Sequence, residues 1–401
     1  MESQHNSIYL DNNATTALDP DVLQAMMPYL TQVYGNASSN SHAFGWEASK
    51  AVEQARARIA TAINAASPAD IIFTSGATES VNLALTGLPP PNGKGRGHII
   101  TSMIEHKAVL DSCARLADRG TAVTYLPPQH DGIISPEALS RAIRPDTYLV
   151  SIMAANNETG TLQKIEATGA LCQEKGILFH TDATQAFGKV AFDVQRMNIS
   201  LAALSAHKIY GPMGVGATYV NTADPRLALS PLIVGGGHER GLRSGTLNVP
   251  GIVGFGRAAE LAIENLPAES ARLRELKNML YHSLLSAVPD MRVNGHLTEC
   301  LPGVLNVSFV GVDASSLLLE LPDIALSTGS ACTSARHSPS HVLIAIGASE
   351  EQIRASVRIG LGRFNNESEV RYVSYRLAEA VKMLRSMAPG EFHVNENNTG
   401  A

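Results

Sequence analysis

The sequence predicts an α/β fold whose larger part is a mostly parallel sheet flanked by helices. Short apolar runs alternate with helical patterns from about residue 70 to residue 220. After three consecutive glycines at 235–237 the pattern changes to a long helical stretch rich in Ala, Leu, Glu and Arg. The chain has 401 residues, of which 44% are apolar, so it can bury a sizeable core in two or three domains.

The elements of the sheet follow one another at regular intervals. Strands are expected at 71–74, 98–102, 122–126, 148–154, 177–181, 201–205 and 215–220. Helices are expected at 107–118, 136–143 and 166–175, where Pro136 fits a first turn and Gly176 a C-terminal cap. Ligands of such sheets bind at the carboxyl ends of the strands, so the residues after each strand are the candidates for chemistry.

A second, smaller α+β domain is expected beyond the glycines. A long helix at 251–285 connects to it, and it contains strands at 304–309 and 356–361, a Gly/Ser-rich loop around Gly329 and a terminal helix at 367–387. We therefore expect a large domain over residues 15–260 and a small domain formed by residues 1–14 and 261–388. The remaining residues, 389–401, are expected to be a disordered tail.

Charge and cysteine content exclude several functional classes. The 31 basic and 37 acidic residues give a net charge of −6, which argues against nucleic-acid binding. Neither an export signal nor a membrane-spanning run is visible, so we expect a cytoplasmic protein that does not bind membranes. The four cysteines, Cys113, Cys172, Cys300 and Cys332, form no Cys-x-x-Cys pair, so neither a metal site nor a disulfide framework is expected.

Two strand ends carry residues suited to a phosphate and to a carbonyl group. The small-residue turn 75–80 joins a strand to a helix, so its backbone N–H groups suit a phosphate. Ordinary helix capping, with Glu79 in the first turn, is the alternative. Lys208 follows another strand just before a Gly-Pro turn, where desolvation would make its amine nucleophilic. A solvated loop lysine is the alternative.

Three further side chains complete the candidates. Asp182 ends a strand, with Gln185 three residues later, and could pair with a protonated ring nitrogen or cap a helix. His106 follows a strand and could stack on a ring, move protons or cap. Cys332 lies in the small, polar run 327–335, which favours an exposed sulfur nucleophile over an inert surface thiol.

A lysine, an aspartate, a histidine and a phosphate turn at one sheet edge, with a loop cysteine, are what pyridoxal phosphate chemistry on sulfur requires. The chain resembles the class V aminotransferase-like cysteine desulfurases, which include the nitrogen-fixation and housekeeping iron–sulfur assembly enzymes. The resemblance implies a fold-type I pyridoxal phosphate enzyme. It covers nearly the whole chain, through blocks at 9–16, 34–36, 75–80, 105–110, 156–160, 180–185, 207–211, 236–241, 243–246, 329–335 and 358–364.

The resemblance assigns roles around pyridoxal 5′-phosphate. Lys208 is similar to the Schiff-base lysine, Asp182 to the partner of the pyridinium nitrogen, and Gln185 to the neighbour of the ring hydroxyl. His106 resembles the ring-stacking acid and base. The cofactor phosphate would be held by Ala77, Thr78, Ser205 and His207, and Thr246 would reach the cofactor of the other subunit in a homodimer.

The resemblance also implies a substrate and a product. Asn157, beside the cofactor, and Arg358 would bind the carboxylate of L-cysteine, Arg358 by a bidentate pair. Cys332 would accept the sulfur as a persulfide, releasing L-alanine, and would pass it to a sulfur acceptor or an iron–sulfur scaffold protein. The family's usual apolar-acidic pair is replaced by Arg336 and His337, which leaves the partner open.

Three other functions remain open on this fold. A selenocysteine or cystine lyase would not need Cys332. A plain aminotransferase would have no use for a loop cysteine. A non-catalytic scaffold of a sulfur pathway would not need the intact set of Lys208, Asp182, His106 and Cys332.

Overall fold

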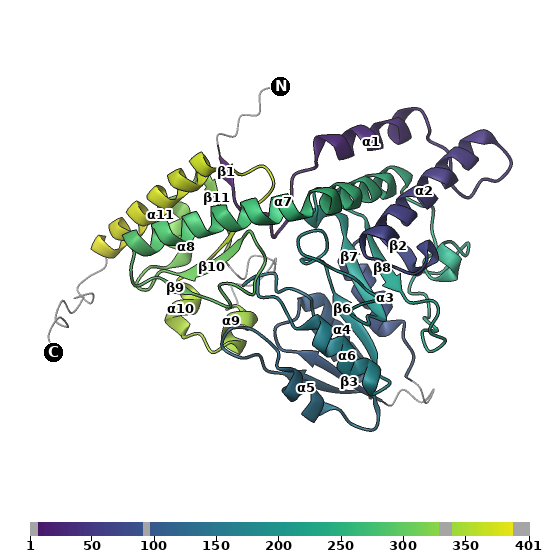
Figure 1. The fold of residues 1–401 in the computed structure, drawn as a ribbon, viewed down its shortest axis with the longest axis horizontal. Helices are drawn as coiled ribbons and strands as arrows, with labels where there is room; N and C mark the ends of the chain where they lie inside the picture. The colour runs from purple at the N-terminus through teal and green to yellow at the C-terminus, as the bar shows by residue number, and fades with distance from the viewer. Residues whose placement is uncertain (1–6, 91–96, 329–338, 388–401) are drawn as a thin grey trace.

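The computed structural model describes residues 7–90, 97–328 and 339–387. Its larger part is built on a seven-stranded sheet with the order β2-β8-β7-β6-β5-β3-β4 (Figure 1). Strands β3 to β7 are mutually parallel, whereas β8 runs antiparallel to both of its neighbours. The mostly parallel sheet is confirmed. The strands are β2 (Ile71–Thr74), β3 (His98–Ser102), β4 (Ala122–Leu126), β5 (Thr147–Ser151), β6 (Leu178–Asp182), β7 (Leu201–Ser205) and β8 (Gly216–Val220).

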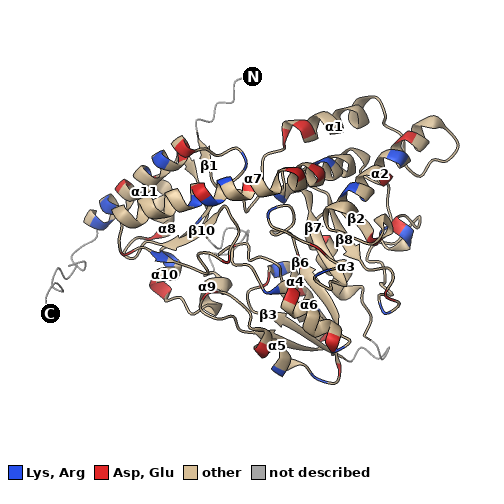
Figure 2. Cartoon of the chain, viewed as in Figure 1, with Lys and Arg blue, Asp and Glu red and all other residues tan. Residues whose placement is uncertain are grey.

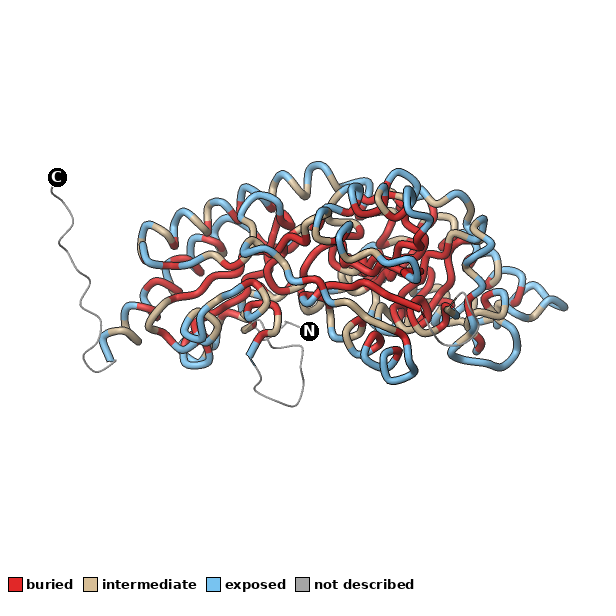
Figure 3. Tube along the Cα trace, turned by 90° about the horizontal axis from the view of Figure 1, so that it is seen from below, coloured by how far each residue is buried: buried red, intermediate tan, exposed pale blue. Residues whose placement is uncertain are grey.

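Both faces of this sheet are covered, because successive side chains of a strand point to opposite faces. Leu149 of β5 belongs to one apolar cluster and Val150 to another. Buried segments accordingly run through the middle of the molecule, with exposed residues on the outer helical turns (Figure 3). The helices of this part are α1 (Pro20–Thr31), α2 (Ala43–Ala62), α3 (Ala77–Thr86), α4 (Lys107–Asp118), α5 (Pro136–Ala142) and α6 (Ile165–Glu174).

A single helix, α7 (Val249–Ala287), extends from this part to a second apolar core. Its first half packs against the large sheet through residues such as Phe255, and its second half packs through Leu280 on the other core. Figure 1 shows α7 passing along both parts. The domain boundaries stay a prediction.

The remaining elements are β1 (Ile8–Tyr9), β9 (Arg292–Val293), β10 (Val304–Ser308), α8 (Ala314–Leu319), β11 (Ile324–Ala325), α9 (His341–Ala345), α10 (Glu350–Arg354), β12 (Ser356–Gly360) and α11 (Glu367–Met387), with short 3-10 turns at η1 (Pro68–Asp70), η2 (Ala206–Lys208) and η3 (Glu239–Gly241).

The second part joins residues that are far apart in the sequence. Strands β12, β10 and β9 form an antiparallel sheet. Strand β1 pairs in parallel with β11, with Ile8 opposite Ile324. Acidic and basic residues are interspersed along the outer helix α11 (Figure 2). Among the described residues, no helix is both long and apolar enough to cross a bilayer, and the cytoplasmic location stays a prediction.

Two features of the fold differ from the sequence-based expectations. Strand β5 ends at Ser151 rather than at residue 154, although Ala154 still donates its backbone N–H to the carbonyl of Asp182. Helices α1 and α2 were not predicted, since neither follows the strand alternation. Asp19 accepts the N–H of Asp21 and thereby caps α1, which is a signal that the sequence does contain.

A buried ion pair fixes α2 to η3. The Arg56 guanidinium donates to both carboxylate oxygens of Glu239, at 2.7 and 2.8 Å, and the side chains are 4% and 1% exposed. Glu239 also accepts the Phe73 N–H at 2.7 Å, and Arg56 donates to the Ile71 carbonyl at 2.6 Å. The pair therefore ties the helix, the turn and strand β2 together.

Replacing Arg56 alone should strongly destabilise the fold, since the buried Glu239 carboxylate then has no charge partner. We expect Arg56→Met to lower the free energy of unfolding by about 3–5 kcal/mol, measured by urea denaturation. The matched control is Arg144→Met, whose pair with Asp146 has side chains 49% and 43% exposed, and it should cost no more than about 1 kcal/mol. Equal costs for the two variants would contradict the importance of the buried pair.

Candidate active site

One cavity of about 550 Å³ lies where the strand ends of the large sheet meet. Because β2, β3, β5, β6 and β7 all point in one direction, the residues after them meet at one edge. The sequence-predicted residues on its wall are Ala77, Thr78, His106, Asn157, Asp182, Gln185, Ser205, His207 and Lys208. The structure thus brings these side chains together, and their roles stay predictions.

Lys208 is held at the end of β7 by backbone oxygens. Its Nζ donates to the carbonyls of Asn13 and Ala14, each at 2.6 Å. These carbonyls belong to the chain segment that follows β1, and both residues line the cavity. Lys208 is therefore an anchored amine rather than a solvated loop lysine.

The start of α3 has the properties of an anion site. No side chain of the described residues caps this helix, whose N-cap is Gly76. Glu79 accepts the Ser75 N–H at 2.8 Å but leaves the N–H groups of the first turn free of a side-chain cap. Ser205 also lines the cavity, and its buried Oγ has no hydrogen-bond partner among the described residues. Free N–H groups and an unpaired hydroxyl suit a phosphate.

Asp182 and His106 both take part in local backbone bonds and still face the cavity. Asp182 accepts the Thr184 N–H at 3.0 Å through one oxygen. His106 caps α4 by accepting the Ala108 N–H on Nδ1 at 3.1 Å. A ring nitrogen that accepts carries no proton, so neutral His106 has its proton on Nε2. Asp182 and His106 can therefore each accept a local backbone N–H and still be part of the site.

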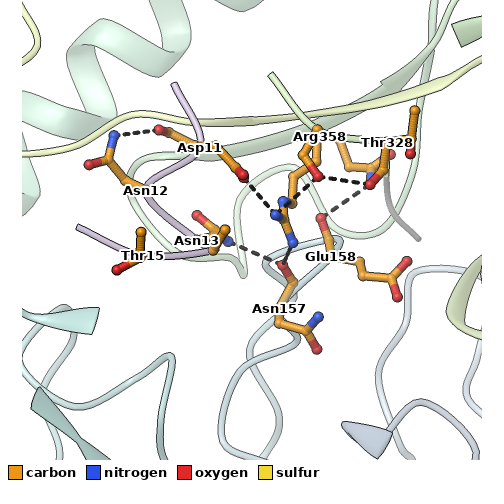
Figure 4. Close-up of polar contacts among 12 residues, drawn as sticks. Asp11, Asn12, Asn13, Thr15, Asn157, Glu158, Thr328 and Arg358 are labelled. Atoms are coloured by element: carbon orange, nitrogen blue, oxygen red, sulfur yellow. Dashed lines mark hydrogen bonds and ion pairs between the residues drawn. The ribbon is translucent and has the colours of Figure 1, made fainter. Parts of the chain in front are cut away.

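Arg358 lies beside the cavity, not on its wall. Its guanidinium donates to Asp11 at 2.6 Å and to the Asn157 carbonyl at 3.0 Å, and only 1% of the side chain is exposed (Figure 4). Its Nε has no hydrogen-bond partner among the described residues. A bidentate bond to a substrate carboxylate would have to replace the Asp11 contact, so this role stays a prediction.

The two other predicted site residues lie elsewhere. Thr246 is exposed between η3 and α7 and does not line the cavity. Cys332 lies outside the described residues. The remaining cysteines, Cys113, Cys172 and Cys300, are buried and unbridged. Burial raises the pKa of both Cys113 and Cys172 to about 12, so these thiols are poor nucleophiles.

The charge state of the cavity depends on burial. Desolvation, assisted by the charges of Lys208 and Lys189, lowers the pKa of His207 to about 4, so this ring is neutral at pH 7. Behind the wall, burial raises the pKa of Glu105 to about 8. Its Oε1 accepts from Ser102 and from the Met153 N–H, at 2.7 and 2.9 Å, whereas Oε2 has no partner among the described residues. Glu105 is therefore a neutral acid at pH 7.

This raised pKa makes stability depend on pH. Below about pH 4.5 both the folded and unfolded states hold the Glu105 proton, and between there and about 8 only the unfolded chain releases it. Release favours unfolding, so stability should fall as the pH rises through this range, by up to about 1.4 kcal/mol per pH unit. We expect Glu105→Gln to flatten the fall, measured by urea denaturation at pH 5 to 8.5. The exposed Glu47→Gln serves as control, and parallel curves for wild type and Glu105→Gln would contradict the assignment.

Sequence reasoning gave no role to several residues of the site. The carbonyls of Asn13 and Ala14 leave no sequence signal, because any residue supplies a carbonyl. Lys189 donates to Gln185 at 3.1 Å. The sequence does contain a signal for this contact, because residues four positions apart lie on the same face of a helical turn. Glu105 was noticed only as the neighbour of His106.

Comparison with known proteins gives consistent matches. The model of a family described as class V aminotransferase matches residues 8–373. The chain is 52% identical to the mitochondrial cysteine desulfurase of Arthroderma benhamiae, over 97% of this chain and 77% of that protein. It is 51% identical to the cysteine desulfurase IscS of Anaeromyxobacter dehalogenans, over 95% and 94%. A solved NifS-like protein has a TM-score of 0.87 and 40% identity, covering 94% of this chain and all of that one. The family match spans every residue on the cavity wall.

Proposed function

The chain belongs to the class V aminotransferase family and, within it, to the cysteine desulfurases, and from this premise we propose that its cavity binds pyridoxal 5′-phosphate and L-cysteine. Cys332 receives the sulfur as a persulfide, and L-alanine is released. One observation carries the proposal: Lys208, Asp182 and the free start of α3 face one cavity. The other predicted site residues add detail to this proposal, which does not depend on them.

The residues on the wall fit this cofactor. The uncapped first turn of α3 and the unpaired Ser205 hydroxyl suit its phosphate, together with Thr78 and the neutral ring of His207. The carboxylate of Asp182 suits a protonated ring nitrogen, and the amine of Lys208 suits the aldehyde. When bound, pyridoxal 5′-phosphate supplies an electron sink for the pair left when an α proton departs.

The protein side chains then bind, orient and move protons. Asn157 and Arg358 hold the substrate carboxylate, and Lys208 removes the proton from the α carbon. His106, whose Nε2 carries its proton, acts as acid and base over the ring. Asp182 keeps the ring nitrogen protonated by holding a negative charge beside it.

The sulfur step is balanced without an external oxidant. The Cys332 thiolate attacks the sulfur of L-cysteine, an S–S bond forms, and the C–S bond breaks with its electron pair left on carbon. A proton taken up at that carbon gives L-alanine. Cysteine and the Cys332 thiol thus become alanine and a Cys332 persulfide.

The persulfide is then passed to a sulfur acceptor or an iron–sulfur scaffold protein. The names of the similar proteins, IscS and NifS-like, support this class of partner. We also propose a homodimer in which Thr246, exposed outside the cavity, reaches the cofactor of the other subunit. The selenocysteine lyase, aminotransferase and scaffold alternatives gain no observation in their favour.

The test is product stoichiometry. Purified protein reconstituted with pyridoxal 5′-phosphate is given L-cysteine and a thiol reductant, and alanine and sulfide are both quantified. The proposal expects visible absorption by the bound cofactor and equal amounts of the two products. Protein that binds no cofactor, or that forms pyruvate or no alanine, would refute it.

A further inference from the structure

A second lysine stands directly behind the cavity wall. The turn after β6 has helical backbone bonds, such as that from the Lys189 N–H to the Ala186 carbonyl, so Lys189 and Gln185 lie on one face. The Nζ of Lys189 donates to Oε1 of Gln185 at 3.1 Å. Gln185 lines the cavity, but Lys189 does not.

This bond determines which way the Gln185 amide points. The Lys189 ammonium can only donate and the Asn13 carbonyl can only accept, so Oε1 faces Lys189 and Nε2 faces Asn13. Nε2 donates one hydrogen to the Asn13 carbonyl at 2.9 Å, which also accepts from Lys208 at 2.6 Å. Lys189, Gln185, Asn13 and Lys208 thus form one chain of contacts, in which the amide NH₂ has a second hydrogen available to a ligand.

We propose that Lys189 is a positioning residue of the enzyme: it holds Gln185 as a hydrogen-bond donor toward the bound cofactor and so favours an anionic oxygen on the cofactor ring. The inference rests on the proposed function, since it requires pyridoxal 5′-phosphate in the cavity. Lys189 acts through Gln185 and does not touch the substrate.

The surroundings of Lys189 are consistent with a donor in either charge state. Its pKa is lowered to about 7, first by desolvation and then by the charge of Lys208, with Arg358 adding to the shift and Glu269 opposing it. Glu269 is itself paired with Arg363 at 2.8 Å. Both the ammonium and the neutral amine carry N–H groups, so the contact with the amide oxygen survives the loss of a proton.

A matched control exists in the same chain. Lys277 is buried whereas Lys189 is half-buried, and the Nζ of Lys277 donates to Cys300 Sγ at 2.9 Å and to the Leu297 carbonyl at 3.3 Å. It contacts no residue of the cavity wall in these bonds. Replacing Lys277 by Met removes a buried amine of the same kind without touching Gln185.

The test is a double-mutant cycle read in cofactor binding. The apoprotein forms of wild type, Lys189→Met, Gln185→Leu and the double variant are titrated with pyridoxal 5′-phosphate, and the visible absorption of each loaded protein is followed against pH. Losing one bond that orients a donor toward a charged acceptor should raise Kd by about 10-fold and raise the apparent pKa of the visible band by about one unit. In the Gln185→Leu background, Lys189→Met should have almost no further effect.

Each outcome is decisive. Additive losses in the double variant, or an unchanged Kd and absorption pKa in Lys189→Met, would overturn the inference. A loss of the same size in Lys277→Met would show a general cost of removing a buried lysine, and would also overturn it. If Lys189→Met does not fold, Lys189→Leu, which also lacks a donor, replaces it in the same cycle with the same two interpretations. The wild type reports separately on the proposed function, because its cofactor binding and alanine formation do not depend on the cycle.

Discussion

Replacing Lys208 by Ala should lower kcat for alanine formation by about 10³-fold or more, since one amine both holds the cofactor and moves the α proton. The two carbonyls 2.6 Å from its Nζ, those of Asn13 and Ala14, keep this amine at one position on the cavity wall. No other lysine lines the cavity within the described residues, so none is placed to replace it there. Alanine is measured at saturating L-cysteine and saturating pyridoxal 5′-phosphate, which separates a loss of kcat from weak binding.

The control for this variant is Lys164→Ala. Lys164 is 45% exposed, pairs with Glu299 at 3.3 Å and does not line the cavity, so kcat should stay within about threefold of wild type. If Lys208→Ala kept a tenth of wild-type kcat, or if borohydride still fixed the cofactor to it covalently, another lysine would be the reactive one.

Cys332→Ser should abolish sulfide release while leaving the cofactor bound. A serine hydroxyl has a far higher pKa than a thiol and cannot accept sulfur as a persulfide, so we expect a loss of about 10³-fold or more in kcat. Its Kd for pyridoxal 5′-phosphate should change less than about threefold, because the cofactor residues are untouched. Sulfide release and the visible spectrum are measured on the same preparation.

Cys300→Ser is the matched control. Cys300 is buried, accepts from Lys277 and donates to the Leu297 carbonyl at 3.1 Å, and a serine can make the same bonds. Its turnover should remain close to wild type. Undiminished sulfide release from Cys332→Ser would instead favour the selenocysteine or cystine lyase alternative, which has no need of this thiol.

Much of the fold was predictable because strand alternation is a local signal. β2, β3, β4 and β7 have the predicted bounds, and residues that follow β2, β3 and β7 do meet at one cavity. The helices α1 and α2 lie before this alternation begins and were not predicted. Their packing on α7, which begins only at Val249, is a tertiary contact that no local pattern of residues encodes.

The reactive side chains of the site were predictable from the sequence, but the groups that hold them in place were not. Lys208, Asp182 and His106 follow strands and carry reactive groups, so sequence alone could single them out. The Asn13 carbonyl and the Lys189 amine act by position, and only the fold reveals that position. The same is true of Arg56 and Glu239, which are 183 residues apart and make a bidentate pair.

The parallel pairing of β1 with β11 has a consequence for biosynthesis. The segment that supplies the carbonyls around Lys208 is made early, yet a strand that pairs with it, with Ile324 opposite Ile8, is made more than three hundred residues later. Closing so long a loop is slow and must wait for the partner strand. A nascent chain that stops short of residue 324 therefore lacks the strand partner of the segment that holds its reactive lysine.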